Sequence, residues 1–372
     1  MKIIIFSNTS WSLYNFRLVL ARDLLRAGHE VALLAPPDEY SPRIEAAGFR
    51  WIPFPMSRQG MNPFAELATI WRLVQLYRRE RPDLVHHFTI KCMLYGSLAA
   101  RLAGVHGVVN TVTGLGYVFG QTDWRGRMLN SFVRAAYRFV LRGAQVIFQN
   151  PDDLAEFTRE GFVDEAHATL IRGSGIDLSL YHSLPESDGE PVVLLAARML
   201  RDKGVGEFVE AARRLRTSGL RARFVLVGDT DAGNPAAIPP AQLKAWQDEG
   251  AVEWLGWRDD MPAVLASAHI VCLPSYYKEG LPRLLLEAAA CARPLVTTDW
   301  PGCREAVRPG VNGLLVPPRD ASALTEALRT LILDRDLRVR MGREGRRMAE
   351  EEFNIQRVNA ATMEVYEKAL QH

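Results

Sequence analysis

The chain has few cysteines and no long apolar run, and both shortages exclude classes of protein. Its 372 residues include four cysteines, without a C-x-x-C pair or metal-ligand spacing. A chain of this length needs no disulfides to close its core, so we expect reduced thiols in a cytoplasmic protein. No apolar run approaches the roughly 18 residues of a membrane span, and residues 2–6 are too short a run for a signal peptide. Any membrane contact is therefore expected to be peripheral.

The chain also lacks a strong overall charge, but its cations are unevenly distributed. The formal net charge is +2, whereas residues 58–142 hold twelve Arg or Lys against four acidic residues. This excess favours a surface that meets an anionic membrane or a phosphate-bearing acceptor. A set of solvated helix faces explains it equally well.

Short apolar runs alternate with helical patterns along the whole chain. The predicted strands are 3–7, 30–35, 84–88, 108–112 and 145–149, followed by 192–197, 224–227, 271–273 and 295–297. Such alternation predicts parallel sheets with helices on both faces, and therefore an α/β fold of two Rossmann-like, doubly wound domains that face an interdomain cleft.

A segment without periodicity separates the two sets of strands. Residues 183–191 are polar and contain Pro and Gly, as is typical of a linker. We therefore predict a first domain over residues 1–180 and a second over 181–355. Residues 356–372 are predicted to form a C-terminal helix that packs back toward the first domain.

Two glutamates eight positions apart mark the predicted active site. Glu279 follows a short apolar run of the parallel-strand type, and Glu287 falls inside the next predicted helix. Pro282 suits the first helical position because it has no N–H group to satisfy. Both carboxylates are expected to face one ligand, while the N–H groups near Gly280 and Leu281 face an anion such as a diphosphate.

Two cations are predicted at the same kind of position. Arg198 ends the strand 192–197, and Lys203 precedes a helix with regularly spaced apolar residues. Either residue alone is more often a surface cation. Beside the glutamate pair, they suit a diphosphate whose charge grows as a glycosidic bond breaks.

A D-x-D sequence offers an alternative use of charge. Asp229 and Asp231 follow the strand 224–227, and carboxylates at a strand end can bind a hard metal ion. The same residues are ordinary turn formers. Because Arg198 and Lys203 already offer charge neutralisation, we predict a site without metal and keep the metal-dependent transferase as a rival hypothesis.

In the first half, His86 and His87 end a predicted strand and Lys91 follows soon after. One histidine can reach a ligand, but strand alternation directs the two to opposite faces, and a histidine with a backbone partner is equally expected. A helix containing Phe64 and Trp71 carries a basic edge. Core packing explains its apolar residues better than contact with a bilayer.

The motifs together resemble the retaining glycosyltransferases of family 4, which have the GT-B fold. The resemblance covers essentially the whole chain and is firmest over residues 191–318. The matching segments are 198–204, the E-x7-E run 279–287, 301–305 and 310–317. Segments 8–17, 87–91, 110–116 and 234–239 are similar to bacterial members, including N-acetylgalactosaminyltransferases, that extend undecaprenyl-diphosphate-linked sugars.

This resemblance implies a role for each predicted site residue. On the donor side, Glu279 contacts sugar hydroxyls, Gly280 to Pro282 offer backbone groups, Glu287 holds the ribose, and Arg198 with Lys203 binds the diphosphate. On the acceptor side, the implied contacts are Asn15, Arg17, His86 and Lys91. The first loop, residues 9–14, lacks the glycines that many family members carry there.

The expected function is transfer of a sugar, an N-acetylhexosamine, from a UDP-sugar to a polyprenyl-diphosphate-linked saccharide. Glu279, Arg198 and Lys203 are the expected catalytic residues, without a further cofactor. The expected partners are the UDP-sugar, the lipid-linked acceptor and an anionic membrane surface at the inner face of the cell membrane, and not a nucleic acid. A soluble acceptor and a non-catalytic regulator that binds nucleotide sugars remain the alternatives.

Overall fold

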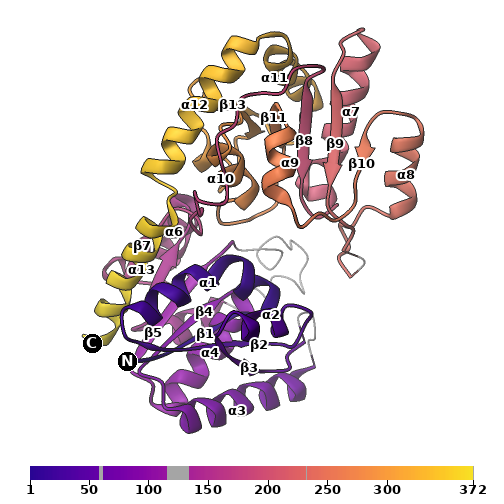
Figure 1. Ribbon diagram of the computed structural model, residues 1–372. Coiled ribbons are helices and arrows are strands. Elements are labelled where there is room, and N and C mark those ends of the chain that lie inside the picture. Colours follow the sequence, from indigo (N-terminus) through magenta and orange to yellow (C-terminus); the bar gives the residue numbers. More distant parts are fainter. Residues whose placement is uncertain (58–61, 115–133, 232, 372) are drawn as a thin grey trace. The chain divides into compact units, whose positions relative to one another are not determined.

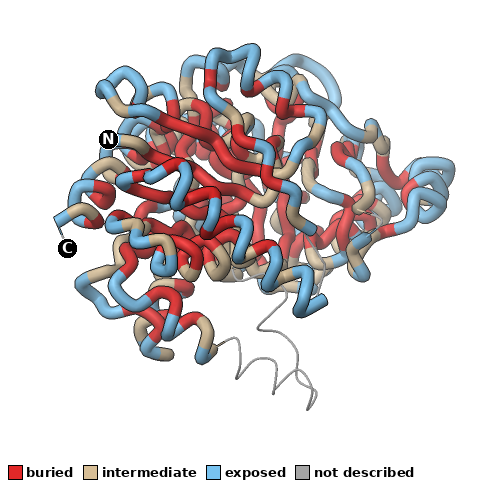
Figure 2. Tube along the Cα trace, turned by 90° about the horizontal axis from the view of Figure 1, so that it is seen from below, coloured by how far each residue is buried: buried red, intermediate tan, exposed pale blue. Residues whose placement is uncertain are grey.

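The protein is described by a computed structural model over residues 1–57, 62–114, 134–231 and 233–371. The chain forms two compact units, one of residues 1–172 with 357–372 and the other of residues 173–356 (Figure 1). In each unit the strands form the buried layer, and exposed residues concentrate in the surrounding helices and loops (Figure 2).

The first unit contains a parallel sheet between two layers of helices. Its strand order is β3 (Arg50–Pro53), β2 (Glu30–Ala35), β1 (Lys2–Phe6), β4 (Leu84–Phe88), β5 (Gly107–Val112), β6 (Gln145–Phe148) and β7 (Ala168–Leu170). Apolar residues of α1 (Ser10–Arg26), α2 (Ser41–Ala46) and α13 (Ile355–Leu370) pack on one face. The opposite face is covered by α3 (Pro63–Glu80) and α4 (Ile90–Ala103), with α6 (Pro151–Arg159), η2 (Glu165–His167) and the helical residues 134–141 completing the unit.

The second unit repeats the same topology. Its strand order is β10 (Glu253–Trp254), β9 (Arg223–Val227), β8 (Val192–Ala196), β11 (Ile270–Leu273), β12 (Leu295–Thr298) and β13 (Gly313–Val316), all parallel. One face is covered by α7 (Val205–Thr217), α8 (Pro240–Asp248) and α11 (Ala321–Leu333). The other is covered by α9 (Met261–Ser267), α10 (Arg283–Ala290) and α12 (Arg335–Glu351), and η3 (Arg201–Lys203) and η4 (Arg304–Ala306) lie in loops.

Both sheets reverse their strand order at one point, as Rossmann-like sheets do. The reversal falls between β1 and β4 in the first unit and between β8 and β11 in the second. Ligands of such sheets bind outside the carboxyl ends of the strands at this point. The two Rossmann-like units confirm the predicted fold class. In the second unit, this topology predicts a ligand site at the loops after β8 and β11.

The chain passes between units earlier than the sequence suggested. Residues 173–180, which we assigned to the first domain, belong to the second unit. The reason is backbone pairing: Ile176 N–H donates to Phe353 O at 2.7 Å, and Ile355 N–H donates to Ile176 O at 3.0 Å.

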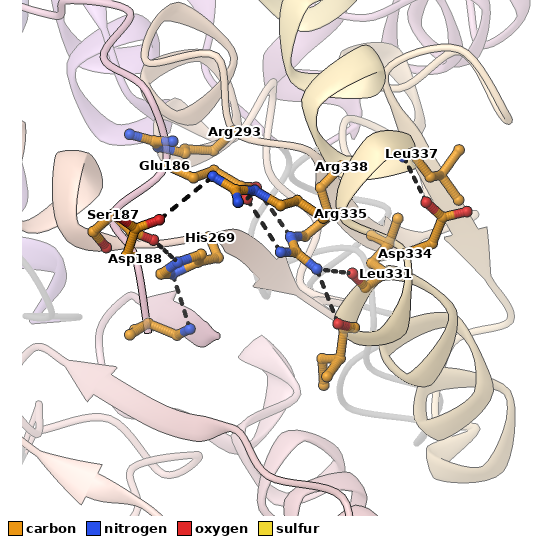
Figure 3. A network of polar contacts seen from close by, with 12 residues as sticks. Glu186, Ser187, Asp188, His269, Arg293, Leu331, Asp334, Arg335, Leu337 and Arg338 are labelled. Carbon is orange, nitrogen blue, oxygen red and sulfur yellow. Dashed lines mark hydrogen bonds and ion pairs between the residues drawn. The ribbon is translucent and has the colours of Figure 1, made fainter. Parts of the chain in front are cut away.

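Residues 183–191, which we predicted as a linker, are held in the second unit by side-chain hydrogen bonds and ion pairs (Figure 3). Both carboxylate oxygens of Glu186 accept from Arg338 of α12, at 3.0 and 3.1 Å, and the two side chains are 6% and 5% exposed. His269 accepts the Val192 N–H and contacts Ser187 O at 2.9 Å. These contacts hold residues 183–191 in place despite their polar, aperiodic sequence.

The last helix completes the first unit. Residues 357–372 belong to that unit, and Val358, Val365 and Tyr366 of α13 are buried in its core. Asn359 donates to Asp23 of α1 at 2.7 Å. In the described part of the chain, no helix combines the length and apolar character that crossing a bilayer requires.

Candidate active site

Glu279 and Lys203 meet at the switch point of the second sheet. The Lys203 Nζ atom lies 2.7 Å from both carboxylate oxygens of Glu279, and the two side chains are 10% and 17% exposed. Ser275 is a buried residue in the loop after β11, and its hydroxyl donates to Glu279 Oε1 at 3.1 Å. The Tyr276 N–H donates to Asp202 O at 2.9 Å and joins the two loops that carry the ion pair.

Two glycines let these loops approach closely. Gly302 has a φ of +84°, and a Cβ there would lie 2.4 Å from Gly280 O and 2.5 Å from Glu279 O. Gly204 has a φ of +74°, and a Cβ there would lie 2.2 Å from Pro274 O. Both positions therefore require glycine, on conformational and on steric grounds. They fix the loop of Glu279 against β12 and the start of α7 against β11.

Arg198 lies beside the same site and contacts Asp231. One guanidinium nitrogen is 2.8 Å from Asp231 Oδ2, with side chains 43% and 26% exposed. The Tyr277 ring is shared by the two cations, because its centroid is 5.9 Å from Arg198 Cζ and 5.3 Å from Lys203 Nζ. The second unit thus brings together Arg198, Lys203 and Glu279, the three residues that the sequence predicted at one site.

Glu287 is held by a different set of partners. Its Oε1 atom accepts from the Tyr181 hydroxyl at 2.7 Å and from Arg283 Nε at 2.8 Å. Burial, and then the charge of Glu287, raise the pKa of Tyr181, so this phenol stays a hydrogen-bond donor. Sequence reasoning missed Tyr181 and Ser275. The contact of Arg283 with Glu287 could have been predicted, because Arg283 stands four residues before Glu287 on the same helix.

The start of α10 differs by one residue from the prediction. Pro282 occupies the N-cap with extended dihedrals, φ −61° and ψ 121°, and the helix begins at Arg283. Glu287 nevertheless lies in the second turn and is 8% exposed. Gly280 and Leu281 lie in the loop between Glu279 and the helix, as predicted, and Pro282 ends that loop.

The thiols are buried, and one of them lies beside the Glu279 loop. All four cysteines are free and buried. Burial, and then the charge of Glu279, raise the pKa of Cys303, whose Sγ atom lies 3.7 Å from Ser275 O, to about 12. A thiol with such a pKa is a poor nucleophile at neutral pH.

The aspartates of the D-x-D sequence do not form a metal cluster of the usual kind. Among the described residues, no group of three or more His, Cys, Asp or Glu side chains is arranged to hold a metal ion. Asp231 instead contacts Arg198, and its backbone carbonyl accepts from Asn234 N at 2.8 Å. The D-x-D segment therefore brings a carboxylate to the cation that we assigned to the diphosphate.

In the first unit, His86 is a buried residue of the core. It is 1% exposed, with Nδ1 2.7 Å from the Tyr366 hydroxyl and Nε2 2.7 Å from the Thr111 hydroxyl. Burial, and then the charge of Arg17, hold its pKa well below the ordinary value, so the ring is neutral. With both nitrogens engaged, this arrangement suits a residue that joins the last helix to the sheet better than one that binds an acceptor.

His87 points to the opposite face, as strand alternation predicted. Its ring contacts the Tyr77 hydroxyl at 3.0 Å and Asn110 Oδ1 at 2.9 Å. Burial lowers its pKa to about 4. Neither histidine is placed as a proton-transfer group with an ordinary pKa.

The other predicted acceptor residues lie on α1 and α4. Arg17 is 8% exposed, and its Cζ atom is 3.8 Å from the Phe88 ring centroid. Asn15 is exposed on α1 and donates to Trp11 O at 2.9 Å. Lys91 contacts Ser57 O and Glu66 Oε1, both at 2.8 Å. The structure therefore brings Arg17 close to His86, while Lys91 is tied to the start of α3.

Two solved structures of similar length have the same fold. A glycosyltransferase from Rickettsia africae aligns over 100% of this chain and 99% of its own, with a TM-score of 0.80 at 19% identity. HepE of Anabaena in complex with UDP aligns over 99% and 100%, with a TM-score of 0.78 at 20% identity. The chain shares its two Rossmann-like parallel sheets with these structures, and this is the GT-B fold.

Sequence comparison leads to the same class. Residues 2–150 match the family model for glycosyl transferase 4-like domains, and residues 190–334 match that for glycosyl transferases group 1. The N,N'-diacetylbacillosaminyl-diphospho-undecaprenol α-1,3-N-acetylgalactosaminyltransferase of Campylobacter jejuni is 32% identical, with 92% of each chain covered. An α-1,3-galactosyltransferase of Escherichia coli that acts on GlcNAc-diphosphoundecaprenol is 26% identical, over 78% of this chain and 76% of its own. The chain therefore belongs to this family of glycosyltransferases.

Proposed function

We propose that this glycosyltransferase moves an N-acetylhexosamine from a UDP-sugar to a sugar linked to undecaprenyl diphosphate, with retention of the anomeric configuration. The observation that carries the proposal is the cluster of Arg198, Lys203 and Glu279 at the switch point of the second sheet. The C. jejuni and E. coli relatives, which act on undecaprenyl-diphosphate-linked sugars, support the acceptor. HepE, bound to UDP, supports the nucleotide.

In the proposed reaction, each side chain acts on a different part of the donor. Arg198 and Lys203 bind the diphosphate and stabilise the charge that grows on it as the bond to the anomeric carbon breaks. Glu279 binds donor-sugar hydroxyls, and Glu287, oriented by Tyr181 and Arg283, binds the ribose. The backbone of residues 280–282 contacts the sugar and phosphate.

Retention is proposed to occur on one face of the sugar. The acceptor hydroxyl oxygen bonds to the anomeric carbon on the face that the phosphate leaves, and its proton passes to the departing phosphate oxygen. This route needs no histidine, in keeping with the buried, neutral His86 and His87. A double displacement through Glu279 is the alternative, and isolation of a glycosyl adduct on Glu279 would establish it.

The membrane partner is proposed to meet the outer surface of α3. Phe64, Leu67 and Trp71 share one side of this helix and are 83%, 63% and 57% exposed, contrary to the core packing expected for them, whereas Val74 and Tyr77 are buried as expected. Glu66 is paired with Lys91, and Glu80 is paired with Lys2 and Arg50. The exposed charges of the helix are arginines, namely Arg72, Arg78 and Arg79.

Such a surface combines an apolar stripe with cations, as peripheral helices on anionic bilayers do. Part of the basic stretch that we predicted between residues 58 and 142 lies outside the described residues. The membrane proposal therefore rests on the surface of α3 alone.

The experiment that tests the function measures release of UDP from a panel of UDP-sugars. Purified protein is assayed with and without an undecaprenyl-diphosphate-linked monosaccharide, each in the presence of a chelator. We expect release from one donor, only with the lipid-linked acceptor and without dependence on metal. Transfer to a soluble sugar alone would favour the soluble-acceptor alternative, loss of turnover with chelator would favour the metal-dependent one, and UDP binding without turnover would favour a regulator.

A further inference from the structure

Arg198 and Lys203, the two proposed donor-site cations, each form an ion pair with a carboxylate, but the two pairs differ in exposure. Lys203 and Glu279 form a pair that is 10% and 17% exposed. Arg198 and Asp231 form a pair that is 43% and 26% exposed. Glu279 already has an expected role at the donor sugar, whereas nothing in the proposed reaction uses Asp231.

The position of Asp231 is built by the loops after β8 and β9. Gly228 has a φ of +128°, and a Cβ there would lie 1.9 Å from Ala197 O, so the two strand ends touch. The Met199 N–H donates to Asp229 O at 2.9 Å, which fixes the second loop against the first. Asp231 thus reaches Arg198 through backbone contacts that are independent of the ion pair itself.

A carboxylate on a cation offers it two oxygens, as a phosphate group does. Arg198 binds carboxylates and phosphates through the same N–H groups. Because the pair is partly exposed, its net stabilisation is small and a diphosphate can replace the carboxylate at little cost. The better-shielded pair of Lys203 and Glu279 is less suited to such exchange.

We propose that Asp231 is a positioning residue that holds Arg198 at the donor site between turnovers. When the donor binds, its diphosphate replaces the Asp231 carboxylate on Arg198. This inference rests on the proposed function, because it assigns the diphosphate of the donor to Arg198. In this role, the Asp231 carboxylate of the D-x-D sequence occupies the place on Arg198 that a donor phosphate takes. Asp231 therefore sets donor affinity by competing with the donor for one cation.

Binding of UDP and of inorganic pyrophosphate tests the proposal, measured by calorimetry with wild-type protein and the Asp231→Asn variant. The variant removes the competing charge and keeps the size of the side chain, so we expect both ligands to bind about three- to fivefold more tightly. The donor KM should fall in parallel. A contact with only a structural role would instead raise KM when lost.

Two controls separate ion-pair exchange from a general change in charge. Asp229→Asn removes the same charge two residues earlier, on an exposed side chain, and should change either affinity by less than about twofold. In an Arg198→Gln background, Asp231→Asn should have no effect beyond that of Asp229→Asn. Equal tightening by both Asn variants, or weaker binding by Asp231→Asn, would overturn the inference.

The same data distinguish this inference from the function on which it rests. Tighter UDP binding by Asp231→Asn in a protein that transfers no sugar would support the role of Asp231 and count against the transferase. Sugar transfer together with weaker UDP binding by Asp231→Asn would do the reverse. A wild-type protein that binds neither UDP nor pyrophosphate would overturn both.

Discussion

At the scale of single residues, two glycines offer a controlled comparison. Gly302 and Gly310 have similar positive φ angles, +84° and +77°, which disfavour other residues. A Cβ at Gly302 would collide with the carbonyl oxygens of Glu279 and Gly280, whereas a Cβ at Gly310 would have nothing within 4 Å. The two positions therefore separate backbone strain from displacement of the loop that carries Glu279.

We predict that Gly302→Ala lowers kcat/KM by at least about 100-fold, because the loop that carries Glu279 must move and small misplacements are costly to catalysis. Gly310→Ala should cost about 1 kcal/mol in stability, from φ alone, and leave kcat/KM within about threefold. Steady-state transfer assays and urea unfolding measure the two effects. Equal losses of activity in both variants would show that the contact with the loop is unimportant.

A second prediction at this scale concerns pH. In the folded protein the pKa of His87 is about 4, below the ordinary value near 6.5. Above pH 6.5 the ring is neutral in both states, so its full contribution is present. As the pH falls from 6.5 toward 4, the unfolded chain takes up a proton that the folded chain refuses, and stability falls by up to roughly 3 kcal/mol.

His87→Gln removes this titration. We expect the free energy of unfolding of the variant to fall less steeply than that of the wild type between pH 6.5 and 4.5, measured with urea at each pH. The variant starts lower at pH 7, because Tyr77 and Asn110 lose their ring partner. Parallel curves for the two proteins would contradict the prediction.

The sequence predicted that Glu279, Arg198 and Lys203 lie together but not which residues orient them. Glu279, Arg198 and Lys203 each follow a predicted strand, and strand ends of one parallel sheet lie at the same edge. Ser275 and Tyr181 lie in loops of ordinary composition, and their contacts with Glu279 and Glu287 depend on loop conformation. The exposed pair of Arg198 with Asp231 is a contact of the same kind, and no periodic pattern specifies it.

At the scale of elements, the strands that the sequence predicted are the inner strands of both sheets. The described strands it missed, β3, β7, β10 and β13, stand at the edges. An inner strand is covered on both faces and reads as a continuous apolar run, as β11 does with every residue buried. An edge strand is short and partly exposed, as β7 and β10 are, and it leaves a weaker pattern.

The contact between segment 183–191 and α12 gives a prediction at the same scale. Arg338→Met leaves the buried carboxylate of Glu186 without its bidentate partner and also removes hydrogen bonds to Leu331 O and Ile332 O. We expect a loss of about 3–5 kcal/mol in the urea unfolding of the second unit. Arg347→Met is the control on the same helix, because that side chain is 49% exposed and pairs at the surface.

Arg347→Met should change the free energy of unfolding by no more than about 0.5 kcal/mol. A loss of similar size in both variants would mean that α12 as a whole, and not the contact with Glu186, determines the effect.

At the scale of the whole molecule, the surface of α3 predicts where the protein meets lipid. Replacing Phe64, Leu67 and Trp71 with Ser should lower binding to anionic phospholipid vesicles about 100-fold, at roughly 1 kcal/mol or more for each side chain that enters the interface. Co-sedimentation with vesicles of phosphatidylglycerol and phosphatidylcholine measures this. UDP affinity should not change, since Arg198, Lys203 and Glu279, the proposed donor-binding residues, lie in the other unit.

The cations of α3 and a distant apolar residue serve as controls. Arg78→Gln with Arg79→Gln should weaken binding to anionic vesicles roughly tenfold and leave binding to neutral ones unchanged. Leu333→Ser changes a side chain that is 70% exposed in the second unit, and it should have no effect. Equal losses with Leu333→Ser and the α3 variant would count against a defined membrane surface.

The route of the chain also determines the order in which the protein is completed during synthesis. Residues 173–356 are contiguous, so the ribosome delivers the whole second unit before it delivers α13, whose residues from 357 onward belong to the first. Multidomain chains usually finish their N-terminal domain first. Here that order is reversed. A chain that stalls near residue 356 would hold a finished second unit and an N-terminal sheet with part of one apolar face uncovered, a species open to proteases and aggregation.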